Sequence, residues 1–247
     1  VNLVLPTFQG SVERIYPFVK RNGQKKGILK NINMQYNFRG ENRVTTTDSL
    51  FLKKEMFDDA KYGMRHSIPI STNFKVLKHL SVSMNGNYEE VWTGSTIKRN
   101  DYDSETGNSG NKVEIKGFDR FSQYNFGMGV GTTIYGLFNF KKESKIEALR
   151  HVIRPSINYS IRPSFDEYYD TYIIDANGNT AEYTRFEDNF FGLPSRTYSS
   201  SIGLQVSNNL EAKVRSKDSL AQESKKITIL NNLNFSTSYN LASDSLK

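Results

Sequence analysis

Residues 149–163 are Leu-Arg-His-Val-Ile-Arg-Pro-Ser-Ile-Asn-Tyr-Ser-Ile-Arg-Pro, and the character of the side chains alternates at every second position. One row is largely apolar and consists of Leu149, His151, Ile153, Pro155, Ile157, Tyr159, Ile161 and Pro163. The other row is largely polar and consists of Arg150, Val152, Arg154, Ser156, Asn158, Ser160 and Arg162. A period of two predicts a β-strand with one apolar face and one polar face.

The length of this segment narrows the class of protein. At about 3.3 Å per residue, the stretch spans roughly 50 Å. Strands of soluble proteins are usually about 5–6 residues long, whereas a tilted membrane-spanning strand needs about 9–11 residues and often extends further into water. The segment is therefore typical of a strand that crosses a membrane.

The same alternation recurs along the whole chain. The predicted strands cover approximately residues 2–18, 32–38, 64–76, 80–92, 124–140, 149–163, 198–214 and 227–241. The connections between them are alternately short and long, as in an outer-membrane barrel with short periplasmic turns and long extracellular loops. We therefore predict an all-β fold, an antiparallel up-and-down transmembrane β-barrel of which this chain forms about eight consecutive strands. The alternative is a large soluble antiparallel sandwich.

The polar rows indicate how wide the barrel is. They are dominated by small or uncharged side chains such as Gly127, Gly129 and Gly131, and Ser199 and Ser201. Such residues leave a wide interior unfilled, whereas a small closed barrel has its interior filled by side chains. We expect residues 1–247 to form part of a single, larger outer-membrane barrel domain, an open curved sheet whose first and last strands do not pair. The remaining barrel strands are expected outside this chain.

Composition excludes several classes of protein. The chain has no cysteine, so disulfides, thiolate nucleophiles and cysteine metal sites are excluded. No apolar run approaches the ~20 residues of a membrane helix. The net charge of +7 is not gathered on one helix or around a base-stacking motif, so nucleic-acid binding is not expected.

The connections between the predicted strands differ in charge. The four short connections together carry a charge of +9, whereas residues 166–188 in the third long connection carry −6. Both types of connection could simply be solvated. Alternatively, the basic turns could meet anionic lipid headgroups at the inner leaflet.

No catalytic constellation can be assembled from the sequence. Of the three histidines, His66 and His151 lie on predicted apolar rows and His79 lies in a turn, without metal-ligand spacing. No Ser-His-Asp arrangement or phosphate-binding glycine loop is present. We therefore predict no catalytic residue, no metal site and no cofactor, and a protein that is not an enzyme.

Basic residues on the polar rows are the candidate functional residues. The candidates expected to face the lumen are Arg65, Arg150, Arg154, Arg162 and Lys213. Arginine suits the recognition of phosphate and carboxylate groups, because it forms bidentate hydrogen bonds. The alternative is that these cations pair with lumen acids such as Glu13, Glu89 and Glu211, or with a plug protein.

Several motifs resemble those of a known family. Residues 149–159, followed by Arg162-Pro163, resemble the Leu-Arg-His-x-x-x-Pro-x-x-x-Tyr barrel strand of the lipopolysaccharide-assembly family LptD, in its Bacteroidota form. Further similarity lies in residues 191–194, 208–215 and 233–242, and in the Leu5-Pro6 strand that ends in Tyr16-Pro17-Phe18. The family's periplasmic jellyroll, first barrel strands and closing strand have no counterpart, so the segment corresponds to the middle of the barrel wall.

The resemblance implies a function and partners. It implies a translocon component in the outer membrane of a Gram-negative bacterium, which inserts lipopolysaccharide into the outer leaflet. The implied partners are lipopolysaccharide, an LptE-like lipoprotein plug, periplasmic lipopolysaccharide-bridge proteins and membrane lipids. The alternative function is solute uptake by a TonB-dependent transporter or a porin-type barrel. A porin would require an inward-folded loop with facing acids and bases.

Overall fold

The computed structural model describes residues 1–20, 23, 27–141, 144–215 and 224–243. The chain divides into two compact units. The first unit comprises Val1–Ser71, Asn85–Phe126 and Arg162–Ser199. The second unit comprises Thr72–Met84, Gly127–Ile161 and Ser200–Lys247.

The fold is an antiparallel up-and-down sheet. Its strands follow one another in chain order: β1 (Asn2–Ile15), β2 (Asn33–Thr45), β3 (Lys61–Val76), β4 (Leu80–Arg99), β5 (Lys112–Gly131), β7 (Ile146–Arg162), β10 (Ser199–Val214) and β11 (Lys225–Asn240). The expected series of eight consecutive strands is confirmed. In this order β1 and β11 are the two terminal strands, as expected for an open series.

Over the described residues, helical structure lies in the connections. Three short 3-10 helices (Leu29–Asn31, Asp48–Leu50 and Asp166–Tyr168) and the single-turn helix α1 (Lys54–Asp58) are present. Within the described residues, no helix is both long enough and apolar enough to cross a membrane.

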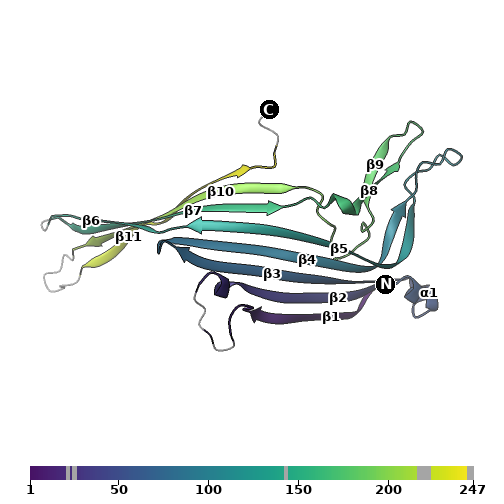
Figure 1. Ribbon diagram of the computed structural model, residues 1–247, viewed down its shortest axis with the longest axis horizontal. Coiled ribbons are helices and arrows are strands. Elements are labelled where there is room, and N and C mark those ends of the chain that lie inside the picture. The colour runs from purple at the N-terminus through teal and green to yellow at the C-terminus, as the bar shows by residue number, and fades with distance from the viewer. Residues whose placement is uncertain (21–22, 24–26, 142–143, 216–223, 244–247) are drawn as a thin grey trace. The chain divides into compact units, whose positions relative to one another are not determined.

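In the first unit, the predicted faces agree with the strand register. Along β1 and β2, which run side by side in purple (Figure 1), Phe8 lies opposite Gly40 and Val12 lies opposite Tyr36. Further along the sheet, Phe38 of β2 lies opposite His66 of β3. Directly opposed residues share a face, so the apolar rows of these strands are continuous.

The pairing of the first strand is irregular. Its pairing with β2 shifts between Val4 and Thr7, and again between Val12 and Ile15. Such a shift changes which face the following residues occupy. Before the first shift Leu3 lies opposite Val44 of the apolar row, and Val4 lies opposite Arg43 of the polar row. The strand ends at Ile15 rather than at the predicted Phe18.

The prediction that residues 124–140 form one continuous strand is wrong. The segment is divided into β5, which ends at Gly131, and β6 (Ile134–Asn139), which pairs with β7 only. Around the break, the Thr132 amide donates to the Pro155 carbonyl and the Thr132 hydroxyl donates to the His79 carbonyl, at 3.1 and 2.8 Å. The side-chain bond is made to the β3–β4 turn, so the interruption lies where the neighbouring hairpin ends.

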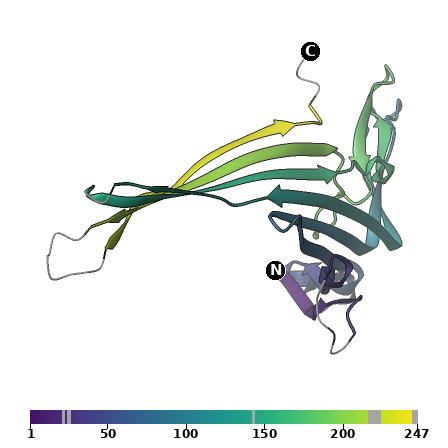
Figure 2. The ribbon, with the colours of Figure 1, turned by 60° about the vertical axis from the view of Figure 1, so that its left-hand side comes forward.

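The other strand ends differ from the predictions mainly in length. Strand β4 continues to Arg99 and β5 begins at Lys112, so the second long connection is only residues 100–111. In the second unit, β10 and β11 run side by side, in green and yellow, with Ile202 opposite Tyr239 (Figure 2). This register keeps the predicted apolar rows of both strands on one face except at Leu210, which lies opposite Leu230 between two register shifts.

The third long connection contains its own secondary structure. A hairpin forms from β8 (Tyr169–Ile173) and β9 (Thr180–Thr184), which the sequence analysis assigned to a loop. Asn177-Gly178-Asn179, a sequence typical of a turn, lies at its tip, where Gly178 has a φ of 80°. Strands this short resemble loop sequence, because they provide only a few alternating positions.

Candidate functional site

The apolar row of the first unit carries a continuous set of aromatic rings. We call it the outer aromatic row, and it consists of Phe8, Tyr36, Phe38, His66, Trp92 and Phe118. The ring centroids of His66 and Trp92 are 4.3 Å apart, and those of Trp92 and Phe118 are 5.6 Å apart. Phe8 is 46% exposed and Phe118 is 67% exposed. A contiguous apolar surface of this kind indicates contact with lipid or another apolar partner.

Glycines on the same row allow the rings to lie against the backbone. A Cβ atom at Gly40 would lie 2.2 Å from the Phe8 ring, and one at Gly10 would lie 2.5 Å from the Phe38 ring. Both pairs are directly opposed in the β1–β2 register. An aromatic ring that covers a cross-strand glycine helps to fix the register of a sheet.

On the polar row of the first unit, charged groups neutralise one another. Arg65 and Glu89 are 2.6 Å apart, and Gln123 donates to the other Glu89 oxygen at 3.2 Å. The pairing that the sequence left open between Arg65 and Glu89 is therefore present. Glu41 is similarly held by Arg39 and Arg43, at 2.5 and 2.9 Å.

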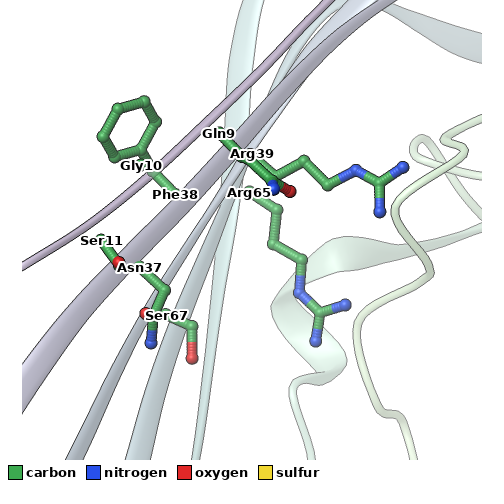
Figure 3. A pocket seen from close by; sticks show the side chains of 8 residues that line it. All are labelled: Gln9, Gly10, Ser11, Asn37, Phe38, Arg39, Arg65 and Ser67. Atoms are coloured by element: carbon green, nitrogen blue, oxygen red, sulfur yellow. The ribbon is translucent and has the colours of Figure 1, made fainter.

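Next to these pairs lies an open polar pocket of about 490 Å³. It is lined by Gln9, Gly10, Ser11, Asn37, Phe38, Arg39, Arg65 and Ser67. In Figure 3 the side chains of Arg39 and Arg65 project to the same side of the strands, and the Phe38 ring points the opposite way. The two rows thus occupy opposite faces of this part of the sheet.

An unpredicted feature covers the polar row of the first unit. Residues 185–196, which we call the strap, follow β9 and fold back onto the strands. Phe186 packs on Val91 of β4 and Phe121 of β5, and all three side chains are almost fully buried. Val91 and Phe121 occupy polar-row positions, so the strap lies on the side where water was expected.

Ion pairs fasten the strap to several strands. Glu187 is 2.7 Å from Arg99 of β4, and Asp188 is 2.8 Å from Lys112 of β5 and 3.2 Å from Lys61 of β3. The hydrogen bond from Arg99 lowers the pKa of Glu187, and the one from Lys112 lowers the pKa of Asp188. The acids of the strap are therefore bound to strand cations, whereas the sequence analysis weighed a purely solvated loop.

In the second unit, two predicted cations are engaged in ion pairs. Arg150 is 3.6 Å from Glu211, and its guanidinium lies 5.6 Å from the centre of the Tyr135 ring. Lys213 is 3.0 Å from Glu147. Both ion pairs hold long side chains in place on the polar row. For these two cations, the alternative expectation of pairing with acids therefore describes the structure.

Comparison with known proteins decides the family. The family model described as LptD protein matches residues 1–247. The chain belongs to the LptD protein family. This is a family of outer-membrane transport and assembly proteins and is not a known enzyme family. Neither the curated proteins nor the solved structures include a significant match to the sequence.

The remaining predicted residues of this LptD-family chain have different surroundings. Arg154 lines a polar pocket of the second unit with Lys75 and Lys78, which the sequence analysis did not select. Arg162 is the last residue of β7 and is exposed. Arg39 was missed as well, although the β2 alternation places it on the polar row.

Two of the three histidines of this LptD-family chain contact polar side chains. The Tyr36 hydroxyl lies 2.7 Å from Nδ1 of His66, and Nε2 of His151 lies 3.2 Å from the Asn208 amide oxygen. Over the described residues, no group of three or more potential ligands among His, Cys, Asp and Glu could hold a metal ion. Each of these two imidazole rings instead has a hydrogen-bonding partner on the apolar row.

Proposed function

We propose that this chain is part of an outer-membrane translocon that inserts lipopolysaccharide into the outer leaflet. The observation that carries the proposal is the match of the LptD family model over residues 1–247. The chain would act without chemistry on its cargo, by providing a surface along which an amphipathic lipid travels.

The separation of the two faces supports this proposal. The outer aromatic row resembles the aromatic girdles by which membrane barrels contact the interface of the bilayer. The opposite face carries arginines, amides and hydroxyls around an open pocket. A glycolipid has acyl chains and an anionic sugar headgroup, so a wall with one apolar and one polar cationic face suits both of its parts.

The proposal includes partners and a location. We infer that residues 1–247 form part of a single barrel domain in the outer membrane of a Gram-negative bacterium. A lipoprotein plug resembling LptE would occupy the polar side, and periplasmic bridge proteins would deliver the lipid. The exposed, cationic residues of the polar row would contact the plug or the headgroup.

Solute uptake is the second candidate function, because of the strap. A loop with acids that face bases on the polar side is a feature expected of a porin, and Glu187 and Asp188 of the strap face Arg99 and Lys112. The strap is, however, packed on the apolar cluster around Phe186 rather than suspended over water. The family match therefore favours lipid transport.

Depletion of the intact protein in cells tests the two functions against each other. Lipid transport predicts that newly made lipopolysaccharide no longer reaches the cell surface, as measured by labelling of surface sugars. Re-expression of the intact protein should restore the signal. If surface lipopolysaccharide is unchanged while uptake of a small hydrophilic solute falls, solute uptake is the function and the translocon proposal is wrong.

A further inference from the structure

A cationic pocket lies on the polar row of the second unit. It has a volume of about 510 Å³, and its basic lining residues are Lys75, Lys78, His79 and Arg154. Lys75 comes from β3, Arg154 from β7, and the other two from the β3–β4 turn. None of the residues that line the pocket is acidic.

The acids of the second unit are bound elsewhere. Glu147 and Glu211 are the acidic residues that the structure describes in this unit. Glu147 pairs with Lys213 and Arg215 at 3.0 and 3.6 Å, and Glu211 pairs with Arg150. Within the described part of the chain, Lys75, Lys78 and Arg154 form no ion pair, so their positive charge is not neutralised locally.

The neutral lining residues add hydrogen-bonding groups around this charge. The pocket also includes Ser81, Ser156 and Gln205, which come from β4, β7 and β10, and Ser207 of β10, whose hydroxyl already donates to the Asn232 amide oxygen at 2.8 Å. Lysine provides a point charge for a phosphate, arginine provides a planar pair of donors, and hydroxyls complete the shell of donors. The lining thus has the composition of a site for an anionic group.

We propose that this pocket binds the phosphate or carboxylate groups of the transported glycolipid. The inference rests on the proposed function and identifies a contact point for the cargo's headgroup. Ser81 and Ser156 belong to the polar rows, whereas bilayer lipids are expected to contact the apolar rows. The pocket therefore faces cargo on the polar side rather than the headgroups of the surrounding bilayer. Free phosphate offers the same chemistry and is the other possible source.

Binding measured on the intact protein in nonionic detergent tests the proposal. The probe is a fluorescent lipid A with two phosphates, and the variant is Lys75→Gln/Lys78→Gln/Arg154→Gln. We expect its affinity to fall about 10-fold or more, because hydrogen bonds to charged groups are lost. The matched control, Arg14→Gln/Lys30→Gln/Lys98→Gln, removes the same charge elsewhere and should bind as the unmodified protein does. Equal weakening by both variants would indicate a nonspecific charge effect and overturn the proposal.

Competition with inorganic phosphate distinguishes the two sources. We expect millimolar phosphate to displace the lipid only weakly, because the lipid offers several anionic groups at once. If inorganic phosphate binds as tightly as the lipid, the pocket is a site for free phosphate and the glycolipid assignment is wrong.

A photo-crosslinker provides a readout in cells that does not depend on removing charges. With p-benzoylphenylalanine in place of Ser81, we expect crosslinks to lipopolysaccharide. The same group in place of Met84, on the apolar row of β4, should give none. No crosslink at Ser81 in cells that export lipopolysaccharide normally would overturn the pocket assignment and leave the proposed function standing. Depletion of the protein without any effect on surface lipopolysaccharide would instead remove the proposed function.

Discussion

At the scale of single residues, adjacent positions of a strand require opposite kinds of side chain, apolar on one row and polar on the other. Ile157 of β7 is 48% exposed on the apolar row, and its neighbour Asn158 is exposed on the polar row. Exposure alone does not distinguish the two positions. The surrounding medium distinguishes them, because Ile157 is expected to contact lipid and Asn158 is expected to contact water.

The first prediction therefore compares Ile157→Arg with Asn158→Arg. Arginine at position 157 should destabilise the folded protein by about 2–4 kcal/mol if the position lies near the bilayer midplane. Arginine at position 158 should have little effect. The check is urea unfolding of the intact protein in lipid vesicles, and equal losses in the two variants would show that the face assignment is wrong.

The second residue-scale prediction concerns the glycine beneath Phe8. Gly40→Ala should destabilise the sheet by about 1–3 kcal/mol, because a methyl group would overlap the ring that covers it. Gly203→Ala is the matched control, since a Cβ atom there meets its nearest neighbour only at 3.8 Å. Unfolding midpoints measure the difference. Unchanged stability of Gly40→Ala would mean that the ring moves aside at little cost.

At the scale of elements, the β3–β4 turn combines strain with charge. Leu77 and Lys78 both have positive φ angles, 50° and 64°, as in the tight hairpin turn that favours Asn-Gly. Replacing the pair with Asn-Gly should stabilise the protein by about 1–2 kcal/mol, because neither residue is then forced into a disfavoured region. Leu77→Val is the contrasting variant and should be destabilising, since a β-branched residue is disfavoured there. Urea unfolding distinguishes the two; similar stabilities would argue against a strained turn.

The strap provides a prediction of pH dependence. The pKa values of Glu187 and Asp188 are lowered in the folded protein from ordinary values of 4.5 and 3.8. Their ion pairs therefore stabilise the docked strap above those values and are lost as the pH falls through the lowered ones. Hydrogen exchange of residues 185–196, corrected for intrinsic rates, should rise in this acid range. Glu187→Gln/Asp188→Asn should be less protected at neutral pH and should show little of this rise.

The element scale also shows what the sequence could predict and what it could not. Long strands such as β7 and β10 were predictable because each repeats the two-residue pattern over many positions. The strap was not, since Val91, Phe121 and Phe186 come from three distant segments and only their contact makes them a core. The break after Gly131 was also hidden, because it depends on where the adjacent hairpin ends rather than on a local breaker residue.

At the scale of the whole molecule, the candidate site was predictable in type but not in its members. The alternation placed Arg65, Arg150, Arg154 and Lys213 on polar rows, where the structure gives them ion pairs or a pocket. It could not indicate which cations are neutralised, because pairing depends on register between strands. Lys75 and Lys78 were not selected, although they line the pocket that includes Arg154.

Cysteine labelling of intact cells tests how this chain is oriented across the membrane. The chain has no cysteine of its own, so single substitutions can be labelled without background. Ala176→Cys lies in the β8–β9 turn of a long connection, and Leu29→Cys lies in the connection between β1 and β2, which the sequence predicted to be a short turn and which comprises residues 16–32 in the structure. Both positions are exposed and both belong to the first unit. With long connections outside and short turns in the periplasm, a membrane-impermeant maleimide should label position 176 in whole cells and position 29 only after the outer membrane is opened. Labelling of position 29 in whole cells, with position 176 protected, would reverse the orientation and place the acidic connection on the periplasmic side.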